Sequence, residues 1–138
     1  EFTPQISVDA PILIPEAYVP DLDLRMGLYR RLGDLDDRAA IDGFAAELID
    51  RFGPLPQETA NLMKIVEVKL NCRAGNVVKL DTGPKGAVAT FGEGGPPDVA
   101  ALFAYIDHLK GAAKLRPDSK LAVTREWPSA EARLNGAL

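Results

Sequence analysis

The sequence is poor in the residues from which most catalytic and metal-binding sites are built. It holds one cysteine and one histidine, which excludes an internal disulfide and leaves a zinc site without a ligand set. Lys and Arg number 16 against 20 Asp and Glu, so the basic excess typical of nucleic-acid-binding surfaces is missing. No apolar run approaches the roughly 20 residues that span a bilayer, and the N-terminus lacks a signal-peptide pattern.

What remains is the composition of an ordinary soluble protein. A chain of 138 residues, 46% hydrophobic and 26% charged, is large enough to bury a core, so we expect residues 1–138 to form one domain. Its single cysteine fits a reducing compartment, which favours a cytoplasmic protein. The first residue is not Met, so we expect a piece of a longer chain.

Prolines shape the first part of the chain. Four of them within residues 1–20 predict an extended arm, because proline fixes its own backbone and disfavours helix just before it. Residues 12–14 are apolar and fit either a short edge strand or an arm lying on the helices. Apolar residues at helical spacing then predict a helical part over residues 21–73, with helices at 21–32, 37–52 and 57–73.

The pattern changes after Gly75 to one typical of strands. We expect a β-hairpin of residues 76–81 and 87–91 around the turn Gly83–Gly86. A helix at 97–109, a strand at 120–124 and a helix from Pro128 complete a ββαβ(α) part over residues 76–138. The predicted fold class is α+β: an N-terminal extended arm and a three-helix unit, then a small antiparallel sheet (hairpin plus one strand) with one or two further helices.

The second predicted helix buries one face and carries charges on the other. We expect its apolar stripe to lie in the core. We also expect the helix to end in a left-handed C-cap at Gly53. That stripe consists of Ile41, Phe44, Ala45, Leu48 and Phe52. Glu47, Asp50 and Arg51 share another side, because their spacing is i, i+3 and i+4. This charged array is either a solvated helix face with a small local ion pair or a docking site for a partner.

Three further features have simple structural interpretations. Gly92–Gly95 precedes a predicted helix but lacks the Lys-Ser/Thr pair of a phosphate-binding loop, so we interpret it as a plain loop. His108 falls on the solvent side of its helix and has no second metal ligand nearby. Cys72 has no histidine to activate it and is interpreted as a small semi-buried side chain.

Two remaining groups also have simple explanations. Capping of the following helix explains the acidic group of Asp34, Asp36 and Asp37 more simply than binding of a cation does. Tyr105 and Trp127 lack the interleaved basic residues of a surface that stacks nucleic-acid bases. The sequence therefore predicts no catalytic residue, no cofactor-binding residue and no metal ligand.

Three motifs in the first half, in their order and spacing, resemble one protein family. These are Ile14–Asp21 (Ile-Pro-Glu-Ala-Tyr-Val-Pro-Asp), Arg25–Leu32 (Arg-Met-Gly-Leu-Tyr-Arg-Arg-Leu) and Glu47–Pro56. Together they resemble the C-terminal domain of the bacterial transcription-repair coupling factors (Mfd), and Asn61-Leu62 and Lys85-Gly86 continue the similarity. The resemblance is strong over residues 12–70 and weaker over 76–138. The family pattern runs past the last residue, so we expect an excised domain.

The resemblance implies a non-catalytic module of a larger machine. The family consists of ATP-driven DNA translocases that displace stalled RNA polymerase and recruit the repair protein UvrA. The motor, with its ATP and Mg, lies upstream, so this domain is expected to be no enzyme and to need no cofactor. In the family this domain docks on the N-terminal UvrB-like module, masks the UvrA-binding surface and restrains the motor. The positions matching Glu47, Asp50 and Arg51 contribute to that contact.

The partners expected from the resemblance are therefore the UvrB-like module for this domain, and RNA polymerase, UvrA and double-stranded DNA for the parent protein. We expect neither nucleic-acid nor membrane binding by the domain itself. Two alternatives stay open: a free-standing adaptor that binds RNA polymerase or a repair protein, and a small hydrolase whose site the residue patterns do not reveal. A reading frame that continues upstream into helicase motifs favours the docking module.

Overall fold

The computed structural model describes residues 3–84, 86–108, 112–116 and 120–124. The chain divides into two compact units. We call residues Ala10–Leu70 the helical unit, and residues Glu1–Asp9 with Asn71–Leu138 the sheet unit. The predicted α+β class is confirmed, since four helices and five strands are present in the described residues.

Three helices form the helical unit, close to where the sequence predicts them. They are α1 (Leu22–Gly33), α2 (Arg38–Phe52) and α3 (Gln57–Ala74), whose last residues belong to the sheet unit. Carboxylates begin the first two: the Asp21 side chain accepts the Leu24 backbone N–H at 3.0 Å, and Asp37 accepts that of Ala40 at 2.7 Å. Each bond satisfies a backbone donor that the helix itself leaves unpaired. The capping interpretation is confirmed at Asp37.

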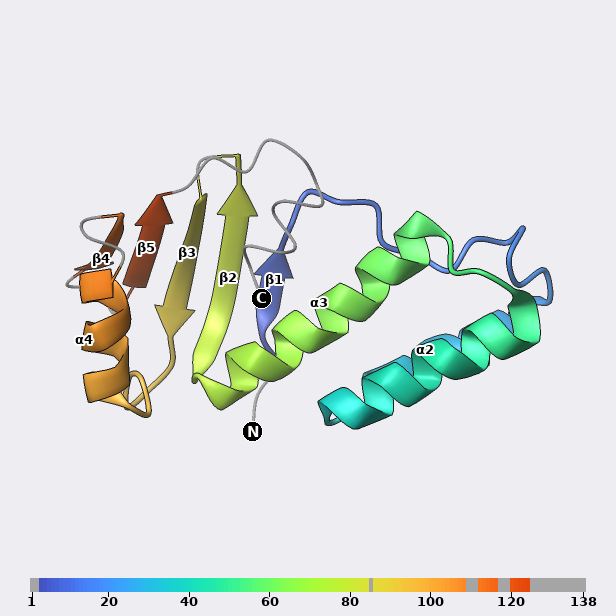
Figure 1. Cartoon of the computed structure of the whole chain (residues 1–138), viewed down its shortest axis with the longest axis horizontal. Coiled ribbons are helices and arrows are strands. Elements are labelled where there is room, and N and C mark those ends of the chain that lie inside the picture. Colours follow the sequence, from blue (N-terminus) through green and yellow to red (C-terminus); the bar gives the residue numbers. More distant parts are fainter. Residues whose placement is uncertain (1–2, 85, 109–111, 117–119, 125–138) are drawn as a thin grey trace. The chain divides into compact units, whose positions relative to one another are not determined.

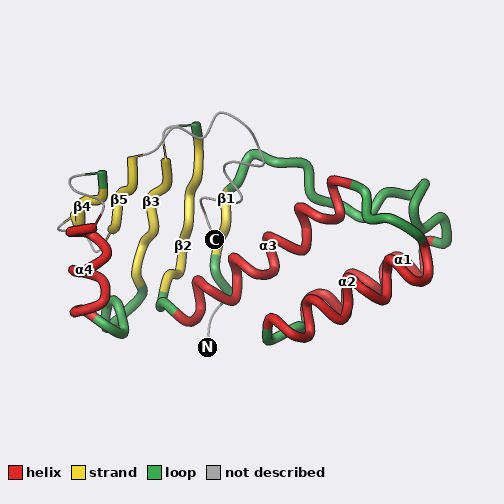
Figure 2. Tube along the Cα trace, in the orientation of Figure 1, coloured by secondary structure: helices red, strands yellow, loops and turns green. Residues whose placement is uncertain are grey.

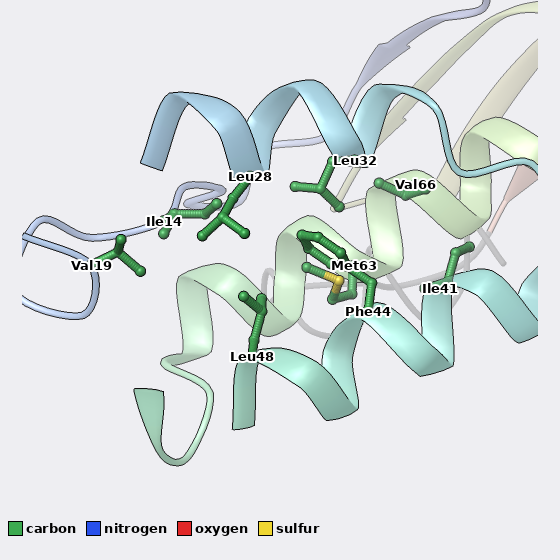
Figure 3. Close-up of a cluster of buried hydrophobic side chains, with 9 residues drawn as sticks. All are labelled: Ile14, Val19, Leu28, Leu32, Ile41, Phe44, Leu48, Met63 and Val66. Carbon is green, nitrogen blue, oxygen red and sulfur yellow. The ribbon is translucent and has the colours of Figure 1, made fainter. Parts of the chain in front are cut away.

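The core of the helical unit contains residues from the arm and from all three helices, as Figure 3 shows. Leu28 and Leu32 of α1 point towards Phe44 of α2 and Met63 of α3 (Figure 3). Phe44 is 3% exposed and Leu48 fully buried, which confirms them as core residues. Phe52 was expected in the core too, but it is only partly buried and packs at the edge of the cluster. It is the last residue of its helix, where the chain turns away.

The arm lies on the start of α3 and forms no strand at residues 12–14. Figure 2 shows this stretch as a long loop between β1 and α1. The Leu13 carbonyl accepts the Thr59 hydroxyl at 3.0 Å, and the Pro11 carbonyl accepts the Asn61 amide at 3.0 Å. Thr59 and Asn61 are buried, and buried polar groups require such partners. Of the two alternatives for this segment, the arm on the helices is confirmed.

The sheet is larger than the sequence predicts. Figure 1 shows its five strands side by side, in the order β1-β2-β3-β5-β4. The predicted hairpin of β2 (Val77–Gly83) and β3 (Gly86–Phe91) is confirmed, and β5 (Lys120–Thr124) pairs antiparallel with β3 as a third predicted strand. Two strands were missed: β1 (Gln5–Ser7), which pairs parallel with β2, and β4 (Ala113–Arg116), which pairs with β5. The three predicted strands are therefore present and antiparallel, but the predicted sheet was too small, because it lacked β4 and the parallel strand β1.

Helix α4 (Val99–His108) begins later than the predicted residue 97 because Asp98 caps it, accepting the Ala101 backbone N–H at 2.9 Å. The predicted last residue, 109, lies outside the described residues. Its Leu102 packs against a small core of Phe91, Ala113 and Leu121. The helix expected from Pro128 lies outside the described residues.

Candidate functional site

The predicted charged array has a fourth member, from a different helix. Arg31 of α1 donates two hydrogen bonds to Glu47 of α2, from Nη1 to Oε2 and from Nη2 to Oε1, both 2.7 Å. Arg51, one helical turn after Glu47, donates from Nη1 to Oε2 at 3.0 Å. The paired bonds from Arg31 form the two-pronged geometry that makes arginine–carboxylate pairs strong and directional. We call Arg31, Glu47 and Arg51 the arginine bridge.

Aromatic rings of α2 lie beneath both guanidinium groups. The central carbon of the Arg31 guanidinium is 4.9 Å from the centre of the Phe44 ring, and that of Arg51 is 5.0 Å from the Phe52 ring. Cations are attracted to the faces of such rings at these distances. Each arginine is therefore restrained from two sides, while the side chains of Arg31 and Arg51 stay 50% and 41% exposed.

The arginine bridge keeps Glu47 ionised. Hydrogen bonds from Arg31 and then from Arg51 lower the pKa of the Glu47 carboxyl to about 2. The same contact raises the pKa of Arg31 above its ordinary value, chiefly through the hydrogen bond to Glu47. The ionised Glu47 carboxylate is thus stabilised by two arginines and not by hydration alone. The expected local pair with Arg51 is present, but the main partner comes from another helix.

Asp50 differs from Glu47, although the sequence places both on the same side of α2. Its side chain is exposed, and it makes no ion pair with any residue that the structure describes. The structure therefore divides the predicted site. Glu47 and Arg51 are engaged with Arg31, while Asp50 has both oxygens available. The Arg-Arg pair that ends α1 is the one sequence signal that could have indicated a cationic neighbour.

Tyr18 of the arm fixes the end of α2, next to the array. Its hydroxyl lies 2.7 Å from the Gly53 carbonyl oxygen and 3.0 Å from that of Leu48, so one proton serves both acceptors. The Tyr18 ring also packs on Phe52, with 5.7 Å between ring centres. Partial burial raises the pKa of Tyr18, so the hydroxyl keeps its proton.

Gly53 ends α2 with φ 96° and ψ −169°. The positive φ is as expected, but the ψ value lies outside the left-handed helical region, so the prediction of a left-handed C-cap is wrong in detail. This backbone region is essentially restricted to glycine. Extended ψ turns the Gly53 carbonyl to the Tyr18 hydroxyl, a contact that no local pattern predicts.

The glycine-rich loop before α4 is held by a single asparagine. The Asn76 amide donates to the carbonyl oxygens of Glu93 at 3.0 Å and Gly95 at 2.8 Å, and the Gly92 N–H donates to the Asn76 carbonyl at 2.8 Å. A Cβ on Gly92 would lie 2.8 Å from the Val78 side chain, so close packing requires glycine there. These contacts agree with a plain loop.

The other candidates give no site within the described residues. Cys72 is buried, and burial raises the pKa of its thiol, which agrees with a structural side chain. No group of potential ligands there, the acidic residues at 34–37 included, could hold a metal ion. The side chains of Tyr105 and His108, and all of Trp127, lie outside what the structure describes. None of the helices in the described residues is long and apolar enough to cross a membrane.

Comparison with known proteins identifies the family. Residues 8–102 match the model of the TRCF domain. A transcription-repair-coupling factor of Rickettsia bellii is 39% identical over 126 residues, 91% of this chain and 11% of the relative. That of Escherichia coli K12 is 24% identical over 130 residues, 94% of this chain and 11% of the relative. The chain thus spans about a tenth of the length of these relatives.

A solved structure supports the fold. The crystal structure of a C-terminal domain of transcription-repair coupling factor superposes with a TM-score of 0.81, covering 99% of this chain and 88% of that chain at 19% identity. The family match covers well over half of the residues, and several relatives exceed 30% identity over most of the chain. The chain therefore belongs to the TRCF domain family of the transcription-repair-coupling factors.

Proposed function

We propose that this domain is an autoinhibitory docking module of a bacterial, cytoplasmic transcription-repair-coupling factor. It binds the N-terminal UvrB-like module of the same chain, masks the UvrA-binding surface there and restrains the ATP-driven motor. The observation that carries the proposal is the charged face of α2. Asp50 is exposed and makes no ion pair with a described residue, and it lies beside two arginines whose positions are already restrained. A face of this kind offers a partner ordered charges at little cost in side-chain entropy.

Covalent attachment makes a modest interface sufficient for such a role. Two modules on one chain meet at high effective concentration, so a weak contact remains closed most of the time. Opening then requires a ligand that binds only the open state. Charged contacts suit this task because they fix the register of docking without the permanent apolar surface of an obligate interface.

The domain itself is proposed to be non-catalytic and to bind no nucleic acid, with ATP, Mg, RNA polymerase, UvrA and double-stranded DNA handled by the rest of the protein. Purified domain should show background ATP hydrolysis and no saturable binding of labelled duplex DNA at micromolar concentration. Saturable binding at low salt would contradict this part of the proposal.

The docking proposal is tested in the intact parent protein with Asp50→Lys. This reversal changes a carboxylate that forms no ion pair within the part of the chain that the structure describes, so it leaves the arginine bridge in place. Reversing Glu47 would also break that bridge. Asp50→Lys should increase UvrA binding and DNA-stimulated ATPase activity towards the values of a protein lacking this domain. Asp36→Lys, the same charge change at an exposed position in the loop between α1 and α2, is the matched control.

The outcomes of this experiment are distinct. An Asp50→Lys protein that folds normally and behaves like wild type in both assays would leave this face a solvated helix surface. A deletion that also leaves UvrA binding and ATPase activity unchanged would contradict autoinhibition itself. That result would favour an adaptor that binds RNA polymerase or a repair protein directly.

A further inference from the structure

We propose that Arg31, on α1 and outside the Glu47–Arg51 segment, is a positioning residue of the docking face. It orients the Glu47 carboxylate and, through it, Arg51, so that docking depends on a residue that need not touch the partner. This inference rests on the proposed function. It specifies which polar atoms on the charged face of α2 remain available to the partner.

The hydrogen bonds at Glu47 show how little of this carboxylate remains free. A carboxylate offers about four acceptor positions, two on each oxygen. Arg31 and Arg51 fill both positions on Oε2 and one on Oε1. Glu47 therefore offers a partner a single position on Oε1, and a partner arginine cannot bind it with both prongs while the arginine bridge is intact. Asp50 is the carboxylate that can accept such a pair.

Arg31 is better restrained than an ordinary surface arginine. Two parallel bonds to Glu47 fix the plane of its guanidinium, and the ring of Phe44, itself 3% exposed, lies beneath it. Arg51 reaches Glu47 through only one bond. Without Arg31, Glu47 would retain one weak local partner on its own helix, and exposed pairs of that kind are worth little. The position of Glu47 therefore depends mainly on Arg31.

The partner chemistry follows from this division. The complementary surface should carry one cationic side chain, arginine by preference, opposite Asp50, and a single donor opposite Oε1 of Glu47. The side chains of Arg31 and Arg51 are 50% and 41% exposed, so their unused N–H groups favour an acceptor on the partner, such as a carboxylate or a backbone carbonyl.

A double-mutant cycle in the intact parent protein tests the positioning role, with UvrA binding as the readout of opening. While the closed state dominates, weaker docking raises the apparent UvrA affinity by the same factor. Arg31→Gln should raise it about fivefold or more, a coupling of ordinary size. Glu47→Gln should have an effect of its own, and the double variant should match Glu47→Gln alone, because Arg31 acts through Glu47.

Two further variants separate geometry from charge. Arg31→Lys keeps the charge but not the two-pronged contact, so it should restore docking only in part. Arg30→Gln removes an exposed neighbouring arginine that has no ion pair among the described residues, and it should behave like wild type. In the isolated domain, Arg31→Gln should move the Glu47 pKa upward from about 2, which NMR titration measures. Unfolding would also raise this pKa, so the amide chemical shifts of residues away from the arginine bridge must stay unchanged in the same spectra.

The results also separate this inference from the proposed function. If Asp50→Lys opens the protein and Arg31→Gln does not, docking stands and the positioning role is wrong. Additive effects of Arg31→Gln and Glu47→Gln would overturn it as well, because Arg31 would then contact the partner directly. If neither Asp50→Lys nor Arg31→Gln changes UvrA binding while deletion of the domain does, docking uses another face and the inference is wrong. If the deletion also leaves UvrA binding unchanged, the proposed function is wrong as well.

Discussion

Arg31 and Glu47 are joined by two hydrogen bonds of 2.7 Å, although 16 positions separate them in the sequence. The contact ties α1 to α2 on the outside of the helical unit, above the apolar side chains that join the same helices in the core. Both side chains are partly exposed, so solvent limits what the pair adds to folding stability. Its larger effect is to hold the Arg31 and Glu47 side chains in one conformation, whereas exposed charged side chains otherwise adopt many.

The first prediction concerns pH. The pKa of Glu47 is about 2 in the folded domain, against 4.5 as its ordinary value. A lowered carboxyl pKa means that the native state favours the ionised form, so its stabilising effect is fully present above pH 4.5 and is lost as the pH falls towards 2. Glu47→Gln removes this contribution at every pH. The difference in melting temperature between wild type and Glu47→Gln should therefore shrink steadily as the pH is lowered from 5 towards 2.

Ile49→Ala is the control for this titration. Ile49 is 48% exposed on the same helix and carries no titratable group, so the difference in melting temperature between wild type and Ile49→Ala should stay nearly constant over the same pH range. A wild-type advantage over Glu47→Gln that does not change with pH would show that the carboxylate is not held as the structure indicates.

The sequence predicted the helices and the core of α2 well because both depend on local periodicity. Phe44 and Leu48 recur at helical spacing, and the aspartates that begin α1 and α2 act on backbone groups a few residues away. The second helix could therefore be placed, with its buried face, before any tertiary contact was known.

What the sequence missed depends on partners far away in the chain. Strand β1 has three residues and exists through pairing with β2, more than 70 positions later, since Gln5 pairs with Lys79. Short strands have no periodicity to detect. Arg31 was missed for a related reason, because its role at Glu47 follows from how two helices pack. The three charged residues of α2 could thus be assigned to one side of the helix, but the pairing of Glu47 with Arg31 could not be derived from one helix alone.

The second prediction concerns the core. Phe44 is 3% exposed between the three helices, so Phe44→Ala should destabilise the domain by about 3–5 kcal/mol through lost burial and the cavity left behind. Chemical denaturation measures this directly. The control is Phe103→Ala, because Phe103 is 55% exposed on α4 and its loss should cost about 0.5 kcal/mol or less. A cost below about 1 kcal/mol at Phe44 would contradict the packing of α2.

The third prediction compares two glycines. In Gly92→Ala the new methyl would lie 2.8 Å from the Val78 side chain and 3.0 Å from Asn76 Oδ1, so we expect a loss of about 1–3 kcal/mol from overpacking. In Gly43→Ala, within α2, the methyl meets nothing within 4 Å, and alanine should stabilise the helix by about 0.5–1 kcal/mol. Denaturation of both variants should show changes of opposite sign. Equal changes would contradict the close approach of the chain at Gly92.

The last prediction concerns the bond between the arm and the end of α2. Tyr18→Phe keeps the ring on Phe52 but removes the hydroxyl that lies 2.7 Å from the Gly53 carbonyl oxygen. The folded state should lose about 0.5–1.5 kcal/mol, the usual net value of one hydrogen bond. Because the carbonyls that lose this donor end α2, amide hydrogen exchange should also become faster at the N–H of Gly53, which bonds to Ile49.

Tyr29→Phe is the matched comparison for Tyr18→Phe. It removes another tyrosine hydroxyl, which accepts the backbone N–H of Ile14 at 2.7 Å, so the arm is weakened at a different point. Its global cost should be similar, but exchange at Gly53 should not change beyond that global effect, since Tyr29 makes no bond to the end of α2. If both variants speed exchange at Gly53 equally, the arm acts on α2 only through overall stability. Faster exchange in Tyr18→Phe alone would show that the arm holds the helix end beside Asp50 and Arg51 through this one hydroxyl.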